Sequence, residues 1–110
     1  MRDDSERLHD MLDAIEQIEK YAVKGREAFE RDELIQSWIV RHIQIIGEAA
    51  AGVVEHTQQM HPEIPWRQIV AMRNILVHAY FRIDIDEVWG VVERDIPTLK
   101  KLIKAALAAM

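Results

Sequence analysis

The sequence predicts an all-α protein: an up-and-down four-helix bundle with a kinked C-terminal helix, forming one domain over residues 1–110. Apolar residues recur at three- and four-residue steps in four separate segments, which is the period of a helix. No segment alternates apolar and polar residues between turn residues, as a half-buried strand would. The connections between the four segments are short, which favours antiparallel neighbours in a bundle, and 110 residues suit one domain.

The first predicted helix covers about residues 3–24, with a single apolar stripe along it. Asp3 and Glu6 have the spacing of a capping box, so Asp3 is expected to cap the amino end. Gly25 is the expected stop, because glycine readily adopts the backbone conformation that ends a helix.

The second predicted helix covers about residues 32–59 and carries apolar residues on more than one face. We therefore expect it to be the central and most buried helix. Gly47 and Gly52 lower its helix propensity, but they permit another helix to approach closely.

Residues 61–65 contain two prolines, so they predict a loop. The third helix is expected to begin near Trp66 and to end between residues 79 and 82. The fourth should begin at Asp84, its amino-terminal cap, and run to the end of the chain. Pro97 lies inside this helix and removes one backbone donor, which predicts a kink there.

The composition is that of a globular protein, with 49% apolar and 30% charged residues. The absence of cysteine excludes disulfides, thiolate metal sites and cysteine nucleophiles. No apolar run approaches the ~20 residues that span a bilayer, and the first six residues are too polar for a secretory signal. We therefore expect a cytoplasmic protein that does not bind a membrane.

The charge is unevenly distributed along the chain. The formal net charge is −5, which by itself disfavours a general nucleic-acid binder. The stretch 65–83, however, has no acidic residue and contains Arg67, Arg73 and Arg82. We call this stretch the basic segment. It is a local positive region in an otherwise acidic chain.

Two residues of the basic segment suit phosphodiester chemistry. Arg73 offers a planar cation that matches a phosphate, and His78 can exchange a proton near neutral pH. In RNA the 2′-hydroxyl can attack the phosphorus while a base accepts its proton, an acid protonates the leaving oxygen, and an arginine stabilises the added charge. Such a reaction needs neither a metal nor a cofactor. The residue pattern alone is weak, and it also fits a structural polar cluster or a surface patch.

Helix geometry supports this pairing only in part. Arg73 and Tyr80 lie about 20° apart around an ideal helix, and Asn74 and His78 are stacked one turn apart. Arg73 and His78, however, lie about 140° apart. Either the helix ends near His78 and the ring swings back, or two copies of the motif meet across a two-fold axis. We favour the dimer.

Other kinds of site find little support in the sequence. It contains no glycine-rich phosphate loop and no HExxH or GxSxG motif. A di-iron bundle would need two Glu-x-x-His pairs, whereas only the segment 6–9 has that spacing. The sequence thus predicts no metal site.

The segment 73–80, Arg-Asn-Ile-Leu-Val-His-Ala-Tyr, resembles the Arg-x4-His-x-Tyr motif of HepT-type toxins in the HEPN superfamily. The resemblance extends over nearly the whole chain in order. It includes Ile-Gly-Glu-Ala at 46–49, Ile-Pro-Trp at 64–66, Val-Trp at 88–89 and Asp-Ile-Pro-Thr-Leu at 95–99.

The resemblance implies a HEPN-like helical bundle, a homodimer, and metal-independent RNA cleavage in the groove between two copies. Arg73 and His78 match the catalytic pair of the family, and Asn74 matches a supporting position. Tyr80 matches the tyrosine to which a cognate antitoxin, a nucleotidyltransferase of the MntA type, transfers AMP. The added phosphate and bulk would repel and block RNA.

Two other interpretations stay open at this stage. The chain could be a non-catalytic binding module that serves a nucleotidyltransferase as subunit or substrate. It could also be a structural helical dimer in which the motif forms a buried polar network.

Overall fold

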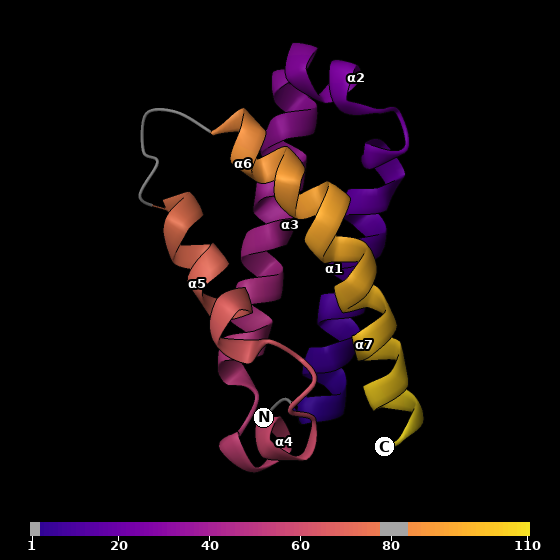
Figure 1. The fold of residues 1–110 in the computed structure, drawn as a ribbon, viewed down its shortest axis with the longest axis vertical. Coiled ribbons are helices and arrows are strands. Elements are labelled where there is room, and N and C mark those ends of the chain that lie inside the picture. The colour runs from indigo at the N-terminus through magenta and orange to yellow at the C-terminus, as the bar shows by residue number, and fades with distance from the viewer. Residues whose placement is uncertain (1–2, 78–83) are drawn as a thin grey trace.

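The computed structural model describes residues 3–77 and 84–110, and the side chains of residues 74–77 are not among those described. Four rods run alternately up and down, as Figure 1 shows, and the predicted all-α bundle is confirmed. The first three are α1, α3 and α5, and the fourth is the continuous run from α6 through η1 to α7. Two short helices, α2 and α4, lie at opposite ends of the bundle. The elements are α1 (Asp4–Ala22), α2 (Arg26–Arg31), α3 (Glu33–Gly52), α4 (Glu55–Met60), α5 (Trp66–Val77), α6 (Ile85–Gly90), η1 (Val91–Asp95) and α7 (Ile96–Ala108).

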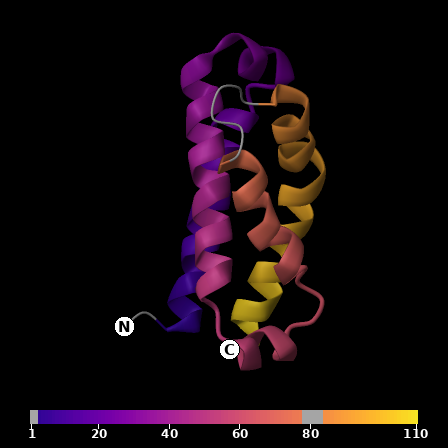
Figure 2. The same cartoon turned by 90° about the vertical axis from the view of Figure 1, so that its left-hand side faces the viewer.

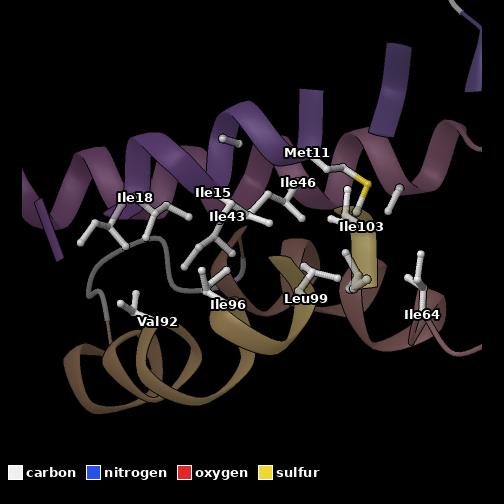
Figure 3. Packing of buried hydrophobic residues seen from close by; sticks show 14 of the residues in the cluster. Met11, Ile15, Ile18, Ile43, Ile46, Ile64, Val92, Ile96, Leu99 and Ile103 are labelled. Atoms are coloured by element: carbon white, nitrogen blue, oxygen red, sulfur yellow. The ribbon is translucent and has the colours of Figure 1, made fainter. Parts of the chain in front are cut away.

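The core lies between α1, α3 and the α6–α7 run. Figure 3 shows apolar side chains from these helices pointing into one shared space, with Ile64 closing one end. Helix α3 packs extensively against both α1 and α5, which confirms that it is the central helix. The side chains with no exposed surface are those of Leu8, Met11, Ile15, Ile18, Ile39, Ile43, Ile46, Ala50, Val88 and Ile103.

The predicted caps are present. Asp3 accepts a hydrogen bond from the Glu6 N–H at 2.8 Å, and Asp84 accepts one from the Glu87 N–H at 3.0 Å. These side chains satisfy backbone donors that the first turn of a helix leaves without partners. Gly25 has φ 92°, a left-handed conformation that glycine adopts without steric cost, and it separates α1 from α2.

Helix α2 was not predicted, because only one of its residues is apolar and buried. That residue is Phe29, which is 1% exposed. The Gln36 amide, 9% exposed, donates to the carbonyl oxygens of Phe29 at 2.9 Å and Glu30 at 3.2 Å. A side chain of α3 thus binds carbonyls at the carboxyl end of α2, where a helix leaves acceptors without partners.

The prediction of one continuous helix over residues 32–59 is wrong. Helix α3 ends at Gly52, and Val53 and Val54 are extended, with ψ angles of 130° and 151°. Val53 is buried in the core, and the Val54 N–H donates to the Asp4 carboxylate of α1 at 3.4 Å. Glycine followed by two β-branched residues is a weak helical sequence, so these long-range contacts decide the local conformation.

The last rod departs from regular α geometry just before Pro97. The Ile96 N–H donates to the Val91 carbonyl five residues earlier, so η1 is a π-helical turn. Pro97 then stands in the first turn of α7, where its missing N–H costs little. The sequence predicts a kink at Pro97; the structure has a widened turn just before this residue, and Pro97 lies in the first turn of α7.

Figure 2 views the bundle from the side on which α5 lies, beside α3 and in front of the last rod. Across the described ranges, no helix is both long and apolar enough to cross a membrane.

Asp4 joins α1 to the segment around α4. Its carboxylate accepts from the Thr57 hydroxyl at 2.5 Å and the Arg7 guanidinium at 3.2 Å, in addition to Val54. Partial burial works against the charged carboxylate, but these hydrogen bonds outweigh it and lower the pKa of Asp4 below its usual value. The stabilisation is therefore complete above the unfolded pKa of about 3.9 and is lost as the pH falls through the folded pKa.

We expect Asp4→Asn to lower the free energy of unfolding by ~1–3 kcal/mol at neutral pH, the usual range for a hydrogen-bonded charged group. The difference from wild type should shrink when denaturation is repeated at pH 3 and below. Glu6→Gln, an exposed change in the same turn, is the control. A difference that stays constant down to pH 2 would contradict the assignment.

Candidate active site

Helix α5 carries the described part of the basic segment, and its amino end is fixed by the preceding loop. The Trp66 indole N–H donates to the His61 carbonyl at 3.0 Å, and the Ile69 N–H donates to the Pro65 carbonyl at 3.0 Å. Ile64 is 1% exposed and fills the end of the core. The two prolines end the preceding structure, and the buried Ile64 and Trp66 fix where α5 begins.

The middle of α5 lies unusually close to α3. A Cβ atom placed on Gly47 would stand 2.7 Å from the Cβ of Arg73 and 3.3 Å from the carbonyl oxygen of Ile69. Gly47 is buried, and Arg73 is partly exposed. The base of the Arg73 side chain is thus packed at the crossing of two helices.

The predicted site residues differ in how far the structure describes them. Arg73 lies in α5, as predicted, and Asn74 follows it in the same helix. His78 and Tyr80 lie outside the described residues, as does the predicted end of the third helix. The pairing of Arg73 with His78 stays a prediction.

The chain after residue 83 is fixed to a different part of the molecule. Asp84 caps α6, and the Arg26 guanidinium of α2 donates to the Asp86 carboxylate. The rings of Phe29 and Trp89 lie 5.4 Å apart, so α2 packs on α6 through apolar contact as well. The two flanks of residues 78–83 therefore differ in their additional contacts: the upstream flank packs closely on α3, and the downstream flank is also held by α2.

The described part of α5 is positively charged. Arg67 is exposed and Arg73 partly exposed, and α5 contains no Asp or Glu. A helix surface with arginines and no acidic side chain favours an anionic ligand such as a phosphodiester. Within residues 3–77 and 84–110, no group of three His, Asp or Glu side chains is placed to hold a metal ion.

Comparison with known proteins assigns the family. The model of the HepT-like family, described as ribonuclease HepT-like, matches residues 11–106. The chain belongs to the HepT-like ribonuclease family. The match includes the whole basic segment and both of its flanks, as the ordered resemblance along the sequence predicted.

Individual relatives agree with this assignment. The "Probable ribonuclease HepT" of Thermococcus cleftensis is 40% identical over 100 residues, which cover 90% of this chain and 91% of the relative. A protein of Methanocaldococcus jannaschii named as an RNase is 31% identical over 104 residues, covering 94% and 95%. Another of Caldanaerobacter subterraneus, also named as an RNase, is 33% identical over 90 residues, covering 82% and 80%. No solved structure matches the chain.

Two features of this HepT-like ribonuclease that bear on the site do not follow from its sequence alone. Gly47 was recognised as a point of close helix approach, but its partner Arg73 was not. The contribution of α2 to the downstream flank was missed altogether, because Arg26 and Phe29 lie about 60 residues from their partners. The only signal in the sequence was a phenylalanine in an otherwise polar stretch.

Arg73→Ala should leave the fold intact, because alanine keeps the Cβ atom that packs at Gly47. We expect the free energy of unfolding to fall by less than about 1 kcal/mol. Ile69→Ala, one turn earlier and 2% exposed in the wild type, should cost ~2–5 kcal/mol. Urea denaturation of both variants tests this, and equal losses would show that the Arg73 guanidinium is itself structural.

Proposed function

We propose that this ribonuclease cuts RNA with Arg73 and His78, without a metal ion or cofactor, in a groove between two copies of the chain. The observation that carries the proposal is the family match over residues 11–106, which includes the only stretch that combines arginine, histidine and tyrosine without an acidic residue. The partly exposed position of Arg73 on α5 supports it, because the guanidinium can reach a ligand from there.

The proposed reaction divides the work between the two residues. The ribose 2′-oxygen attacks the adjacent phosphorus, the bond to the 5′-oxygen breaks, and a 2′,3′-cyclic phosphate and a 5′-hydroxyl are formed. The 2′-hydroxyl loses a proton as it attacks, and the leaving 5′-oxygen gains one; His78 of one or both copies carries these protons as base, as acid or as both. Arg73 stabilises the charge that builds on the phosphoryl oxygens. Asn74 supports the site as a neutral hydrogen-bonding residue.

The proposed homodimer follows from the directions in which one helix projects these residues. Positions 73 and 78 are about 140° apart around an ideal helix, so one straight helix does not direct both at one phosphate. A two-fold axis beside α5 would bring Arg73 of one copy toward His78 of the other and double the positive charge. We place this enzyme in the cytoplasm, with RNA as its substrate.

We further propose that the enzyme is the toxin of a toxin–antitoxin pair. Its partner would be a nucleotidyltransferase of the MntA type that transfers AMP to Tyr80, two residues after the proposed proton-transfer residue. The adenylyl group would add a negative phosphate and a bulky nucleoside near the basic segment, so RNA would be both repelled and blocked.

Alanine at either proposed catalytic residue should abolish most of the activity. His78→Ala should cut a single-stranded RNA ~10²–10⁴-fold more slowly, the usual scale for a general acid or base. Cells expressing wild type without a partner should stop growing and lose intact RNA, whereas cells expressing Arg73→Ala/His78→Ala should do neither. Harmless wild type with intact RNA would instead support a non-catalytic binding module.

Tyr80→Phe separates catalysis from its control. This variant should cut RNA at a rate close to that of wild type, because the phenol hydroxyl is not needed for the reaction proposed above. It should also remain active when it is incubated with the nucleotidyltransferase and ATP, whereas wild type should gain the mass of one or more AMP groups and lose activity. Silencing of Tyr80→Phe under these conditions would mean that another residue is modified.

A further inference from the structure

The crossing of α3 and α5 places a glycine directly against the proposed catalytic arginine. Gly47 is buried in the interior of α3, where glycine is a poor helix former. Its backbone has no positive φ that would require glycine. The backbone conformation therefore does not require glycine at position 47. The requirement must come from the atoms around it.

What surrounds Gly47 is the backbone and the first side-chain atom of α5. A methyl group at Gly47 would stand 2.7 Å from the Arg73 Cβ, 3.3 Å from the Ile69 carbonyl oxygen and 3.5 Å from the Arg73 Cα. These atoms are rigid parts of the helix and cannot rotate away. Relief of the contact requires α5 to move relative to α3, and Arg73 would move with it.

There is space for such a movement. Beside its contact with α3, α5 borders an open groove of about 350 Å³, whose wall includes Met72 of α5 and Leu99 and Leu102 of α7. A displaced α5 can move toward this space without breaking the core of α1, α3 and α7. A methyl group at Gly47 should therefore shift Arg73 and leave the fold standing.

We infer that Gly47 is a positioning residue for RNA cleavage: its lack of a side chain sets how closely α5 approaches α3, and thereby where the Arg73 guanidinium stands. This inference rests on the proposed role of Arg73. Because misplacing a catalytic group by about 1 Å can cost on the order of 10²-fold in rate, the effect on turnover should far exceed the effect on stability.

The chain offers a matched control in the same helix. The atoms nearest to a methyl group at Gly52 would all belong to the far end of the Arg7 side chain, the closest at 2.6 Å, and that flexible end can move away. Gly47→Ala and Gly52→Ala are thus the same chemical change in α3, one against a rigid helix and the other against a movable side chain.

The experiment measures kcat, KM and Tm for both variants with a single-stranded RNA oligonucleotide. We expect Gly47→Ala to lose at least about 10-fold in kcat, with little change in KM, and Gly52→Ala to match wild type. In an Arg73→Ala background, Gly47→Ala should cause a much smaller loss than in wild type, because its effect acts mainly through the arginine. The inference would be overturned if Gly47→Ala had the wild-type kcat. It would also be overturned if Gly47→Ala lowered kcat by the same factor in the Arg73→Ala background as in wild type.

A second measurement does not depend on activity. The side-chain Nε–H resonance of Arg73, assigned by its absence in Arg73→Ala, should shift in Gly47→Ala and stay in place in Gly52→Ala. If wild type leaves RNA intact, the proposed function is wrong. The chemical shift of the Arg73 Nε–H would still show whether Gly47 sets the position of Arg73. Should Gly47→Ala be too unstable to purify, the same comparisons are made at a lower temperature and with a stabilising osmolyte, with wild type and Gly52→Ala measured under the same conditions.

Discussion

The fold depends on the burial of α3 along more than one side. Ile39, Ile43 and Ile46 have no exposed surface, and α1 and α5 pack against different faces of this one helix. Burial of this kind is the main favourable term in folding, so α3 is the element against which the others are placed. The position of α5 is set in this way, and with it the position of Arg73.

Residues 78–83 follow α5 and precede α6 in the chain, and these two helices are held by different contacts. Upstream, Trp66 is fixed by the His61 carbonyl, and α5 lies on α3. Downstream, Arg26 and Phe29 of α2 hold Asp86 and Trp89 of the last rod. The short helix α2 thus helps to hold the chain that follows residue 83, although it lies about 60 residues away in sequence. This arrangement places Arg73 through one set of contacts and the chain after residue 83 through another.

Patterns in neighbouring residues predicted the features of the fold that neighbouring residues determine, such as helix caps. Asp3 and Asp84 cap their helices because a cap involves only residues three positions apart. The break at Val53 depends on a carboxylate about 50 residues away, and α2 depends on Gln36 and the last rod. No periodicity in a single sequence reports such partners.

The site shows the same division. Helical spacing placed Arg73 on a helix and marked Gly47 as a point of close approach, since both are properties of one segment. The contact between Gly47 and Arg73 depends on how α5 lies along α3. That placement results from the packing of α3 and α5 together and from the loop before Trp66. The meeting of Arg73 with His78 stays a prediction, because it depends on residues outside those described and on a second copy of the chain.

The charge distribution gives the proposed control its physical basis. The chain carries −5 overall, whereas residues 65–83 contain three arginines and no acidic residue, so under the proposed function RNA would be attracted to this stretch. Where a site has so few positive charges, RNA binding depends strongly on each of them. One added phosphate near Tyr80 would cancel a large fraction of the local charge, whereas the same group on a strongly basic nuclease would change little. Under the proposed control, an acidic body would therefore weaken general RNA binding and make the enzyme more sensitive to a single modification.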